Sequence, residues 1–345
     1  MIKRILSISI LLCVLVCSLS ACTGGTEKFS TYTMDYFDTL TTITGYEKSQ
    51  EAFDAVADGI IEELRELHRL YSIYHRFDRI ENLCTINELV DGEHRTVTVD
   101  RRIIDMLLYA KDMYYKTDGI MNVAMGSVLS LWHDYRTIGK DNPAEASLPP
   151  MEKLQEASLH CDIEKMVIDE ENNTVTLTDP GMRLDVGAVA KGYAVECIAK
   201  GLEEKGITGY VLNVGGNVRA IGTKGDGTPW TVGIENPDGG DYLSYLGLDG
   251  YSLVTSGSYQ RFYYVDGKAY HHIIHPDTLM PSEGFLSVSV VCRDSGLADA
   301  LSTTLFCLPL DEGQQLIEKF DGAEAMWVSE DGVKTFSDGW KSFEN

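Results

Sequence analysis

Basic residues are scarce in this chain, since 29 Lys and Arg stand against 53 Asp and Glu, giving a formal net charge of −24. Binding to nucleic acid depends on clustered Lys and Arg that neutralise phosphates, so this balance argues against a nucleic-acid partner. It also argues against electrostatic docking on an anionic lipid surface. An acidic protein that handles a phosphate compound needs a cation to mediate the contact.

Paired cysteines are also missing, because no CxxC sequence occurs among the eight cysteines. Cys13 and Cys17 fall in an N-terminal leader and Cys22 directly follows it, which leaves an odd number. The remaining five lie mostly in apolar sequence and are Cys84, Cys161, Cys197, Cys292 and Cys307. Buried free thiols are therefore expected, rather than a disulfide framework or a zinc site.

Domain linkers are lacking as well. The chain has no internal repeat, no low-complexity segment and no stretch rich enough in proline or glycine to divide it. Strand and helix patterns mix without strict alternation, which favours an α+β fold over a doubly wound parallel sheet. We expect one compact domain over residues 31–345.

The N-terminus has the order of a secretory signal, with the basic MIKR, the apolar ILSISILLCVLVCSL and then LSAC. The apolar run is too short to span a bilayer comfortably. Small residues leading directly to a cysteine resemble the lipobox of bacterial lipoproteins. We therefore expect residues 1–21 to be removed, Cys22 to carry lipid, and residues 22–30 to form a tether on the extracytoplasmic face of a cell membrane.

Hydrophobic periodicity predicts the main elements. Apolar residues recur at helical spacing in two long segments, 48–71 and 100–117, and Asp100 is placed to cap the second. Strand patterns occupy residues 30–46, 166–178, 209–222, 229–237, 251–274 and 285–292. Two helices at 297–306 and 311–320 and a hairpin at 324–336 close the chain, and residues 137–150 have the composition of a surface loop.

The segment LADALSTTLF, residues 297–306, carries Asp299 and Thr303 in an otherwise apolar helix pattern. Positions four apart share one face of a helix, so a carboxylate and a hydroxyl lie side by side. Both groups offer the hard oxygens that Mg²⁺ and Ca²⁺ prefer. Taken alone, the segment rather favours an exposed polar edge in which Thr303 bonds back to the Asp299 carbonyl.

Two further segments contain residues suited to chemistry. In LDVGAVAKGYA, Asp185 and Lys191 flank a glycine turn that opens a helix, which suits either an anion site or a plain strand–helix junction with a surface ion pair. In YHHIIHPDT, His271 and His272 would point to opposite faces of a strand. A lone histidine is usually structural, although histidine is the side chain best suited to accept a proton near neutral pH.

Nine segments, taken in order, resemble one family closely: the FAD:protein FMN transferases, or ApbE-type flavin transferases. The segments lie between about residues 37 and 308 and are FDTLTTI, YSIYHRFDRIENLCTIN, DGIMNVAMGSVLSLW, LDVGAVAKGYAVE, YVLNVGGNVRAIG, WTVGIENP, VTSGSYQRFY, YHHIIHPDT and VSVVCRDSGLADALSTTLF. A single glycine-rich match would arise easily by chance, whereas nine in the same order are specific. The resemblance implies an ApbE-like α+β domain with mixed or antiparallel sheets and flanking helices.

The resemblance also implies an activity. Members of the family move the FMN half of FAD onto a threonine hydroxyl of a partner protein and release AMP. This implies FAD as the substrate, Mg²⁺ as the cofactor that neutralises the pyrophosphate, and a redox flavoprotein with a target threonine as the partner. Hydrolysis of FAD to FMN and AMP, or FAD binding without catalysis, would use the same pocket, and both remain open.

Site residues follow from the same resemblance. The implied Mg²⁺ ligands are Asp299, Thr303 and the carbonyl of Ala188, with Ser302 adjoining them. His272 matches the family's histidine and is the implied base for the acceptor threonine. The implied flavin and adenine contacts are Phe37, Tyr74, Met121, Asn122, Val123, Asp185, Lys191 and Ile273.

The chain departs from the common family pattern away from the metal positions. His275 stands where the family commonly has Asp, and Leu279 and Met280 replace a following TG-type pair. Near the N-terminus, FDT replaces the more frequent MGT, and Asn122 stands where Asp is usual.

Overall fold

The computed structural model describes residues 25–88, 95–237 and 239–344. The expected leader and Cys22, the expected site of lipidation, lie outside the described residues. Residues 27–30, which were expected in the tether, form the first part of a strand.

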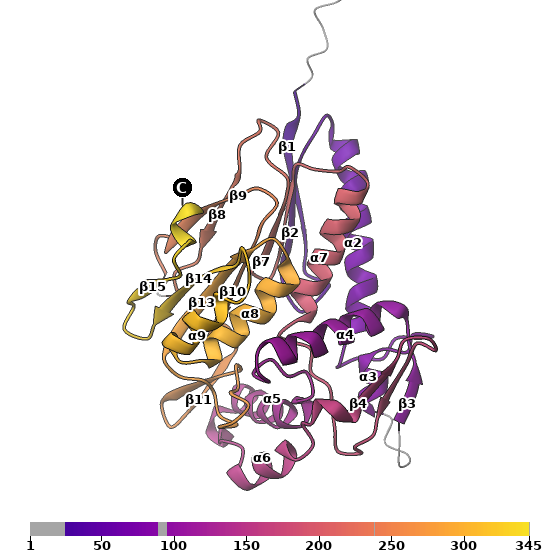
Figure 1. Ribbon diagram of the computed structural model, residues 1–345, viewed down its shortest axis with the longest axis vertical. Coiled ribbons are helices and arrows are strands. Elements are labelled where there is room, and N and C mark those ends of the chain that lie inside the picture. The colour runs from indigo at the N-terminus through magenta and orange to yellow at the C-terminus, as the bar shows by residue number, and fades with distance from the viewer. Residues whose placement is uncertain (1–24, 89–94, 238, 345) are drawn as a thin grey trace, which may run out of the picture.

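An eight-stranded sheet forms the centre of the molecule, and every neighbouring pair in it is antiparallel (Figure 1). In spatial order, its strands are β1 (Glu27–Thr33), β2 (Thr41–Glu47), β6 (Tyr210–Val214), β7 (Asn217–Ile221), β10 (Ser252–Gly257), β13 (Phe285–Cys292), β14 (Glu324–Ser329) and β15 (Lys334–Phe336). The predicted α+β class with antiparallel sheets is confirmed.

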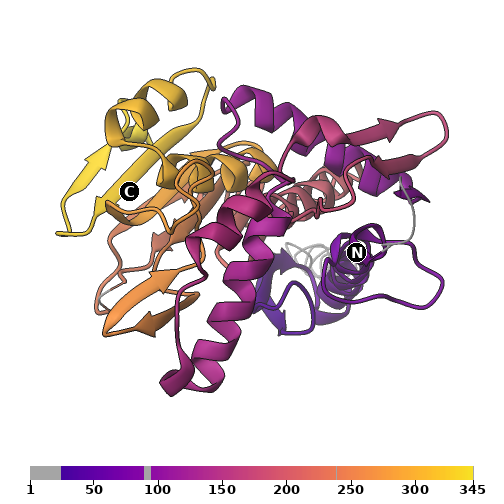
Figure 2. The same cartoon turned by 90° about the horizontal axis from the view of Figure 1, so that it is seen from below.

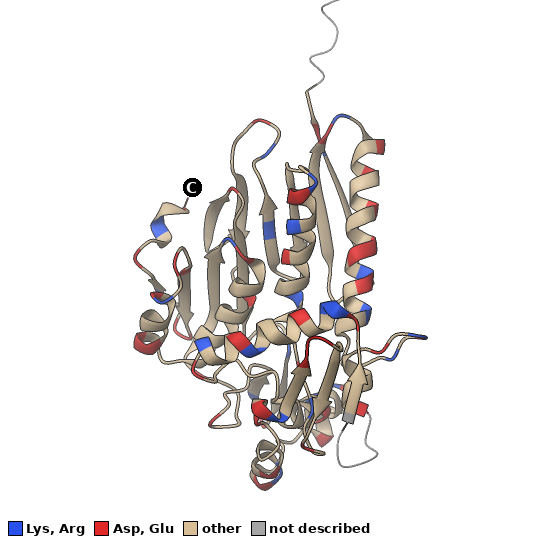
Figure 3. Ribbon diagram, turned by 45° about the vertical axis from the view of Figure 1, so that its right-hand side comes forward, with Lys and Arg blue, Asp and Glu red and all other residues tan. Residues whose placement is uncertain are grey.

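Three helices cover one face of this sheet: α2 (Gln50–Tyr71), α7 (Ala190–Glu204) and α8 (Ser295–Cys307). Ser49 caps α2 by accepting a hydrogen bond from the Ala52 N–H, in the way that serine satisfies a free helix donor. The largest hydrophobic core lies between these helices and the sheet, and includes Leu64 and Leu301. Figure 3 shows that acidic residues recur along the ribbon of α2.

The opposite face of the sheet is covered by the hairpin of β8 (Trp230–Ile234) and β9 (Ser244–Leu248) and by the C-terminal turn η3 (Trp340–Ser342). Trp230, Leu246 and Trp340 are buried there in a second hydrophobic core. The central strands are therefore buried on both faces, which explains why β13 is apolar over most of its length rather than alternating.

Most of the remaining elements gather at one end of the molecule. Figure 2 shows α5 and α6 there, seen from below. These elements are α3 (Leu83–Glu88), β3 (Arg95–Thr98), α4 (Arg101–Lys116), α5 (Gly126–Asp141), η1 (Pro143–Glu145), α6 (Met151–Ser158), η2 (Ile163–Lys165), β4 (Met166–Asp169), β5 (Thr174–Leu177), β11 (Phe262–Val265) and β12 (Lys268–His271). The helix α9 (Leu310–Ile317) packs instead against α8 and β14. A third cluster, with Trp132 and Leu279, packs α5 against the turn after β12.

Most predicted elements are confirmed, including the helices near 48–71 and 100–117 and the Asp100 cap. Two predictions were wrong in extent. Residues 30–46 form two paired strands rather than one, and α5 runs to Asp141, into the predicted surface loop. The buried apolar side chains of α5, Val128 and Trp132, lie in its first half, and only Gly139 is buried after them, so the apolar pattern does not reach residues 137–141.

The five cysteines of the described chain are free thiols, as predicted. Burial raises the pKa of the Cys307 thiol to about 11, which makes it a weak nucleophile near neutral pH. Within the described ranges, no helix has both the length and the apolar character needed to cross a bilayer.

Candidate active site

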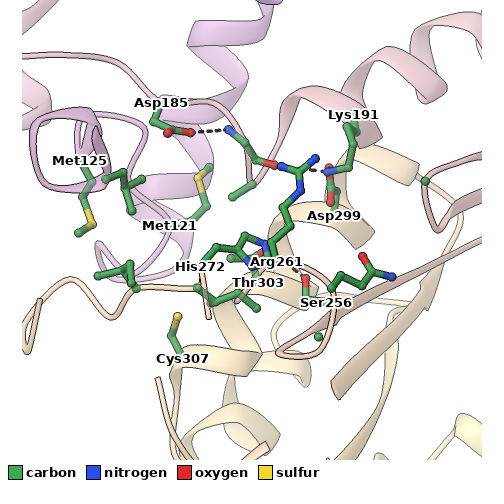
Figure 4. Close-up of a pocket in the computed structure, with 18 of the residues that line it drawn as sticks. Met121, Met125, Asp185, Lys191, Ser256, Arg261, His272, Asp299, Thr303 and Cys307 are labelled. Atoms are coloured by element: carbon green, nitrogen blue, oxygen red, sulfur yellow. Dashed lines mark hydrogen bonds and ion pairs between the residues drawn. The ribbon is translucent and has the colours of Figure 1, made fainter. Parts of the chain in front are cut away.

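A cavity of about 330 Å³ opens where α8, the start of α7, the end of β10 and the segment before α5 meet (Figure 4). Many residues implied by the family resemblance line it together: Tyr74, Met121, Asn122, Val123, Asp185, Ala188, Lys191, His272, Ile273, Asp299 and Thr303. Phe37 and Ser302 are not part of this lining. The sequence separation of these residues shows that tertiary packing, not local structure, assembles the cavity.

A close contact between α7 and α8 builds one wall. A Cβ atom on Gly192 would lie 2.3 Å from the Ser295 carbonyl oxygen and 2.4 Å from the Asp299 Cβ, so only glycine permits this approach. The Gly192 N–H donates to Asp299 Oδ2 at 2.8 Å, and Lys191 Nζ lies 3.7 Å from the same oxygen. The two helices thereby place a buried carboxylate beside a lysine.

Asp299 is only 4% exposed, and burial raises the pKa of its carboxyl group. Lys191 and the Gly192 N–H act in the opposite direction and favour the ionised form. A carboxylate that is removed from water with a single nearby ammonium group is well suited to bind a divalent cation, which would favour ionisation further.

Thr303 lies one helical turn from Asp299 and lines the same cavity. Its hydroxyl is 3.2 Å from the Ser256 hydroxyl at the end of β10. The back-bond to the Asp299 carbonyl comes from the neighbouring Ser302, which is fully buried and also lies 2.8 Å from Ser256. Thr303 therefore presents its hydroxyl to the cavity, while Ser302 ties the helix to β10.

The turn before α7 is closed by Asp185, whose Oδ1 accepts a hydrogen bond from the Gly187 N–H at 2.8 Å. Burial raises the pKa of Asp185, whereas this N–H and the nearby charge of Arg136 lower it. Lys191 Nζ donates to the Gly187 carbonyl at 3.4 Å, which folds the lysine back over the turn. Ala188, the next residue, faces the cavity from this turn.

The donor chemistry fits a hard cation. Asp299, Thr303 and Ala188 offer a carboxylate, a hydroxyl and a backbone carbonyl, which are the oxygen ligands that Mg²⁺ takes together with water and phosphate oxygens. In the described part of the chain, no group of three His, Cys, Asp or Glu side chains is arranged to hold a metal ion. The residues present thus suit Mg²⁺, and Asp299 is the carboxylate among these three ligands.

His272 enters the cavity directly after β12, while His271 points to the other side, as the strand pattern predicts. His271 Nε2 lies 2.7 Å from the Ser282 carbonyl oxygen, which marks it as structural. His272 Nδ1 is buried without a hydrogen-bond partner in the described structure. Burial, followed by the charges of Arg261 and Arg136, lowers the pKa of His272 to about 3, so the ring is neutral near pH 7.

Several residues of the cavity were not predicted, among them His133, Arg136 and Arg261. His133 and Arg136 lie on one turn of α5, and Arg136 Nη2 is 3.0 Å from His133 Nδ1. The Tyr74 ring, from the segment after α2, lies 5.3 Å from the His133 ring. Together they form a wall of two rings and a guanidinium group. Arg261 faces the cavity from the loop before β11 (Figure 4). Had α5 been predicted beyond residue 132, the three-residue spacing of His133 and Arg136 would have placed both on one face.

Phe37 lies beside the cavity rather than in it. Its backbone N–H donates to His68 Nδ1 at 3.1 Å, and the two rings pack edge to face at 5.5 Å. Phe37 and Asp38 both have positive φ, 54° and 51°, which costs energy for residues with side chains. Asp38 and Thr39 line the cavity as a result.

Comparisons with known proteins agree with this geometry. The model of the ApbE family matches residues 37–327. The FAD:protein FMN transferase of Treponema pallidum is 32% identical over 343 residues, which cover 94% of this chain and 91% of the relative. The crystal structure of the ApbE protein from Thermotoga maritima, 29% identical, superimposes with a TM-score of 0.80 and covers 92% of this chain and 100% of its own.

A second relative and a second structure extend the comparison. The FAD:protein FMN transferase of Klebsiella pneumoniae is 30% identical over 268 residues, 74% of this chain and 81% of the relative. The flavin transferase ApbE from Vibrio cholerae has a TM-score of 0.74 at 24% identity, over 92% of this chain and 99% of its own, and shows that the fold is shared.

Proposed function

The chain belongs to the ApbE family and is an FAD:protein FMN transferase, and from this premise we propose the chemistry of its site. FMN is transferred from FAD to a threonine hydroxyl of a partner redox flavoprotein, AMP is released, and Mg²⁺ is the cofactor. One observation carries this proposal: Asp299, Thr303 and Ala188 line the same cavity as Lys191 and His272.

The transfer is a displacement at phosphorus. The threonine oxygen forms a bond to the phosphorus of the FMN half, the P–O bond to the AMP phosphate breaks, and AMP leaves with the electron pair of that bond. The threonine proton passes to His272, whose neutral ring can accept it. Mg²⁺ bound by Asp299, Thr303 and the Ala188 carbonyl would neutralise charge on the pyrophosphate as the bond breaks.

The cationic side chains have a second role near the base. Arg261, Arg136 and Lys191 all lower the pKa of His272, after the larger effect of burial. A pyrophosphate in the cavity offsets these positive charges, so we expect substrate binding to raise the pKa of His272 toward the range useful for a base. Proton acceptance would then be favoured only when FAD is bound.

The site of action is part of the proposal. A lipid on Cys22 would hold the domain at the extracytoplasmic face of a cell membrane, where the partner would be a membrane or extracellular redox protein. Support comes from the order of the N-terminal sequence and from the start of β1 at Glu27, five positions after Cys22.

The decisive experiment mixes the mature protein with FAD, Mg²⁺ and a threonine-bearing flavoprotein acceptor. Covalent flavin fluorescence in a denaturing gel and AMP release are measured together, and equal amounts of both indicate transfer. Asp299→Asn should abolish both while keeping an acceptor for the Gly192 N–H. Asp311→Asn, the same change at an exposed position of α9, is the matched control.

Two results would contradict the proposal. AMP and FMN without a labelled acceptor would indicate hydrolysis of FAD. Unchanged transfer by Asp299→Asn would show that the metal is held elsewhere.

A further inference from the structure

Asn217 is an anomaly in the wall of the cavity. Its side chain is 1% exposed, yet neither its amide oxygen nor its amide nitrogen has a hydrogen-bond partner in the described structure. A buried amide left without partners costs free energy, and such groups are rare unless a ligand satisfies them. Asn217 lines the cavity together with Asp299.

Strand pairing on both sides holds the backbone at Asn217, and the side chain is buried from solvent. It begins β7, where it pairs with Val214 and with Val254 on either side. The preceding turn needs Gly215 and Gly216 at φ of 57° and 91°. A Cβ on Gly215 would lie 2.2 Å from the Thr39 hydroxyl, which shows how tightly the turn is packed.

The amide of Asn217 faces Asp299. Among the groups that favour the ionised form of Asp299, and so lower its pKa, it follows Lys191 and the Gly192 N–H. The amide and the carboxylate are too far apart for a hydrogen bond of normal length, yet close enough for the amide to favour the ionised carboxylate. An amide nitrogen carries two N–H donors, so one that faces Asp299 leaves the other for an acceptor in the cavity, such as a phosphate oxygen.

We propose that Asn217 donates an N–H hydrogen bond to a phosphate oxygen of the FAD pyrophosphate beside Asp299. This inference rests on the proposed function and adds a substrate-binding residue to it. Phosphate oxygens only accept hydrogen bonds, and a neutral donor fixes their position without adding another positive charge beside Lys191. The amide would fix the orientation of the phosphate group, whereas the cationic side chains would attract its charge.

The test measures FAD binding at saturating Mg²⁺ and, separately, Mg²⁺ binding without nucleotide. Asn217→Asp replaces the N–H donors by an oxygen at nearly constant volume and should weaken FAD binding by at least about tenfold, as expected when a charge-assisted hydrogen bond is lost. Mg²⁺ binding without nucleotide should be retained or strengthened. The matched control is Asn213→Asp on the same hairpin, exposed and outside the cavity lining, which should bind FAD like the wild type.

A second variant separates substrate binding from a structural role. Asn217→Leu removes the unpaired amide, so the free protein should keep or raise its melting temperature while its FAD affinity falls. Asn217→Asp binding FAD as tightly as the wild type would overturn the inference. So would an Asn217→Leu protein that melts lower and binds FAD normally.

The same measurements distinguish this inference from the proposed function. FAD binding needs no acceptor and no turnover, so a wild-type protein that binds FAD but transfers nothing would contradict only the proposed function. Loss of transfer in Asn217→Asp with normal FAD affinity would overturn the inference alone.

Discussion

Replacing glycine by alanine should change the stability in opposite directions at two positions of α7, Gly192 and Gly201. At Gly192, a Cβ would lie 2.3 Å from the Ser295 carbonyl oxygen, a distance that real Cβ atoms do not adopt, so α7 and α8 must separate. At Gly201, on a later turn of the same helix, an added methyl group would find nothing within 4 Å. Replacing each by alanine therefore isolates the close approach of the helices from the helix propensity of alanine.

The magnitudes follow from the contacts. Overpacking costs about 1–3 kcal/mol, and weakening the bond from the Gly192 N–H to Asp299 costs about 1.5–3 kcal/mol. Alanine returns about 1 kcal/mol through helix propensity. Gly192→Ala should thus lower the free energy of unfolding by about 1.5–5 kcal/mol, whereas Gly201→Ala should raise it by up to about 1 kcal/mol.

Urea unfolding gives the stability of both variants, and the rise in melting temperature on adding Mg²⁺ reports the metal site. Gly192→Ala should show a smaller Mg²⁺-dependent rise than the wild type, because Asp299 moves with α8, while Gly201→Ala should match the wild type. Equal stabilities for the two variants would refute the argument that helix contact at Gly192 positions the carboxylate.

Three further predictions concern titration and backbone strain. Arg261→Gln should raise the pKa of His272, measured by NMR titration of its ring, because Arg261 is the largest charge effect on it after burial; an unchanged value would remove Arg261 from the account. The pKa of His272 is about 3 in the folded protein and 6.5 in the unfolded chain. Between pH 6.5 and pH 3 the unfolded state therefore binds more protons, so the free energy of unfolding falls as the pH drops through this range. His272→Gln should flatten this acid limb in urea titrations, and an unaltered slope would contradict it. Leu279→Gly should relieve about 1 kcal/mol of backbone strain at φ 59°. It also removes a buried side chain that contributes about 2–3 kcal/mol, so calorimetry should find a net loss of stability. A gain of stability would mean that the strain outweighs the burial.

The sequence predicted the part of the site that local geometry determines. Asp299 and Thr303 share a helix face because they are four residues apart, and His272 and His271 diverge because strand side chains alternate. Neither conclusion needs to know what packs nearby. An error of a few positions in the predicted helix and strand boundaries would change neither conclusion.

Asn217 and Arg261 could not be predicted in the same way. An asparagine after two glycines is typical of an exposed turn, and only the covering of β7 on both faces buries this one. The sequence does not distinguish Arg261 from the other arginines, and only the fold shows that it lines the cavity. Long-range packing, which one sequence does not reveal, decides both cases.

The distribution of positive charge links the fold to the reaction. In this acidic chain, Arg101, Arg102 and Arg219 are each tied to carboxylates. Arg136 and Arg261 have no carboxylate within ion-pair distance among the described side chains, and both line the cavity. A dianionic pyrophosphate would therefore meet two guanidinium groups for which no carboxylate competes, whereas Arg101, Arg102 and Arg219 would first have to give up an ion pair. The excess of acidic residues over the whole chain then favours selectivity, because a negative protein repels phosphates in general, whereas the cavity that contains His272 presents Arg136 and Arg261.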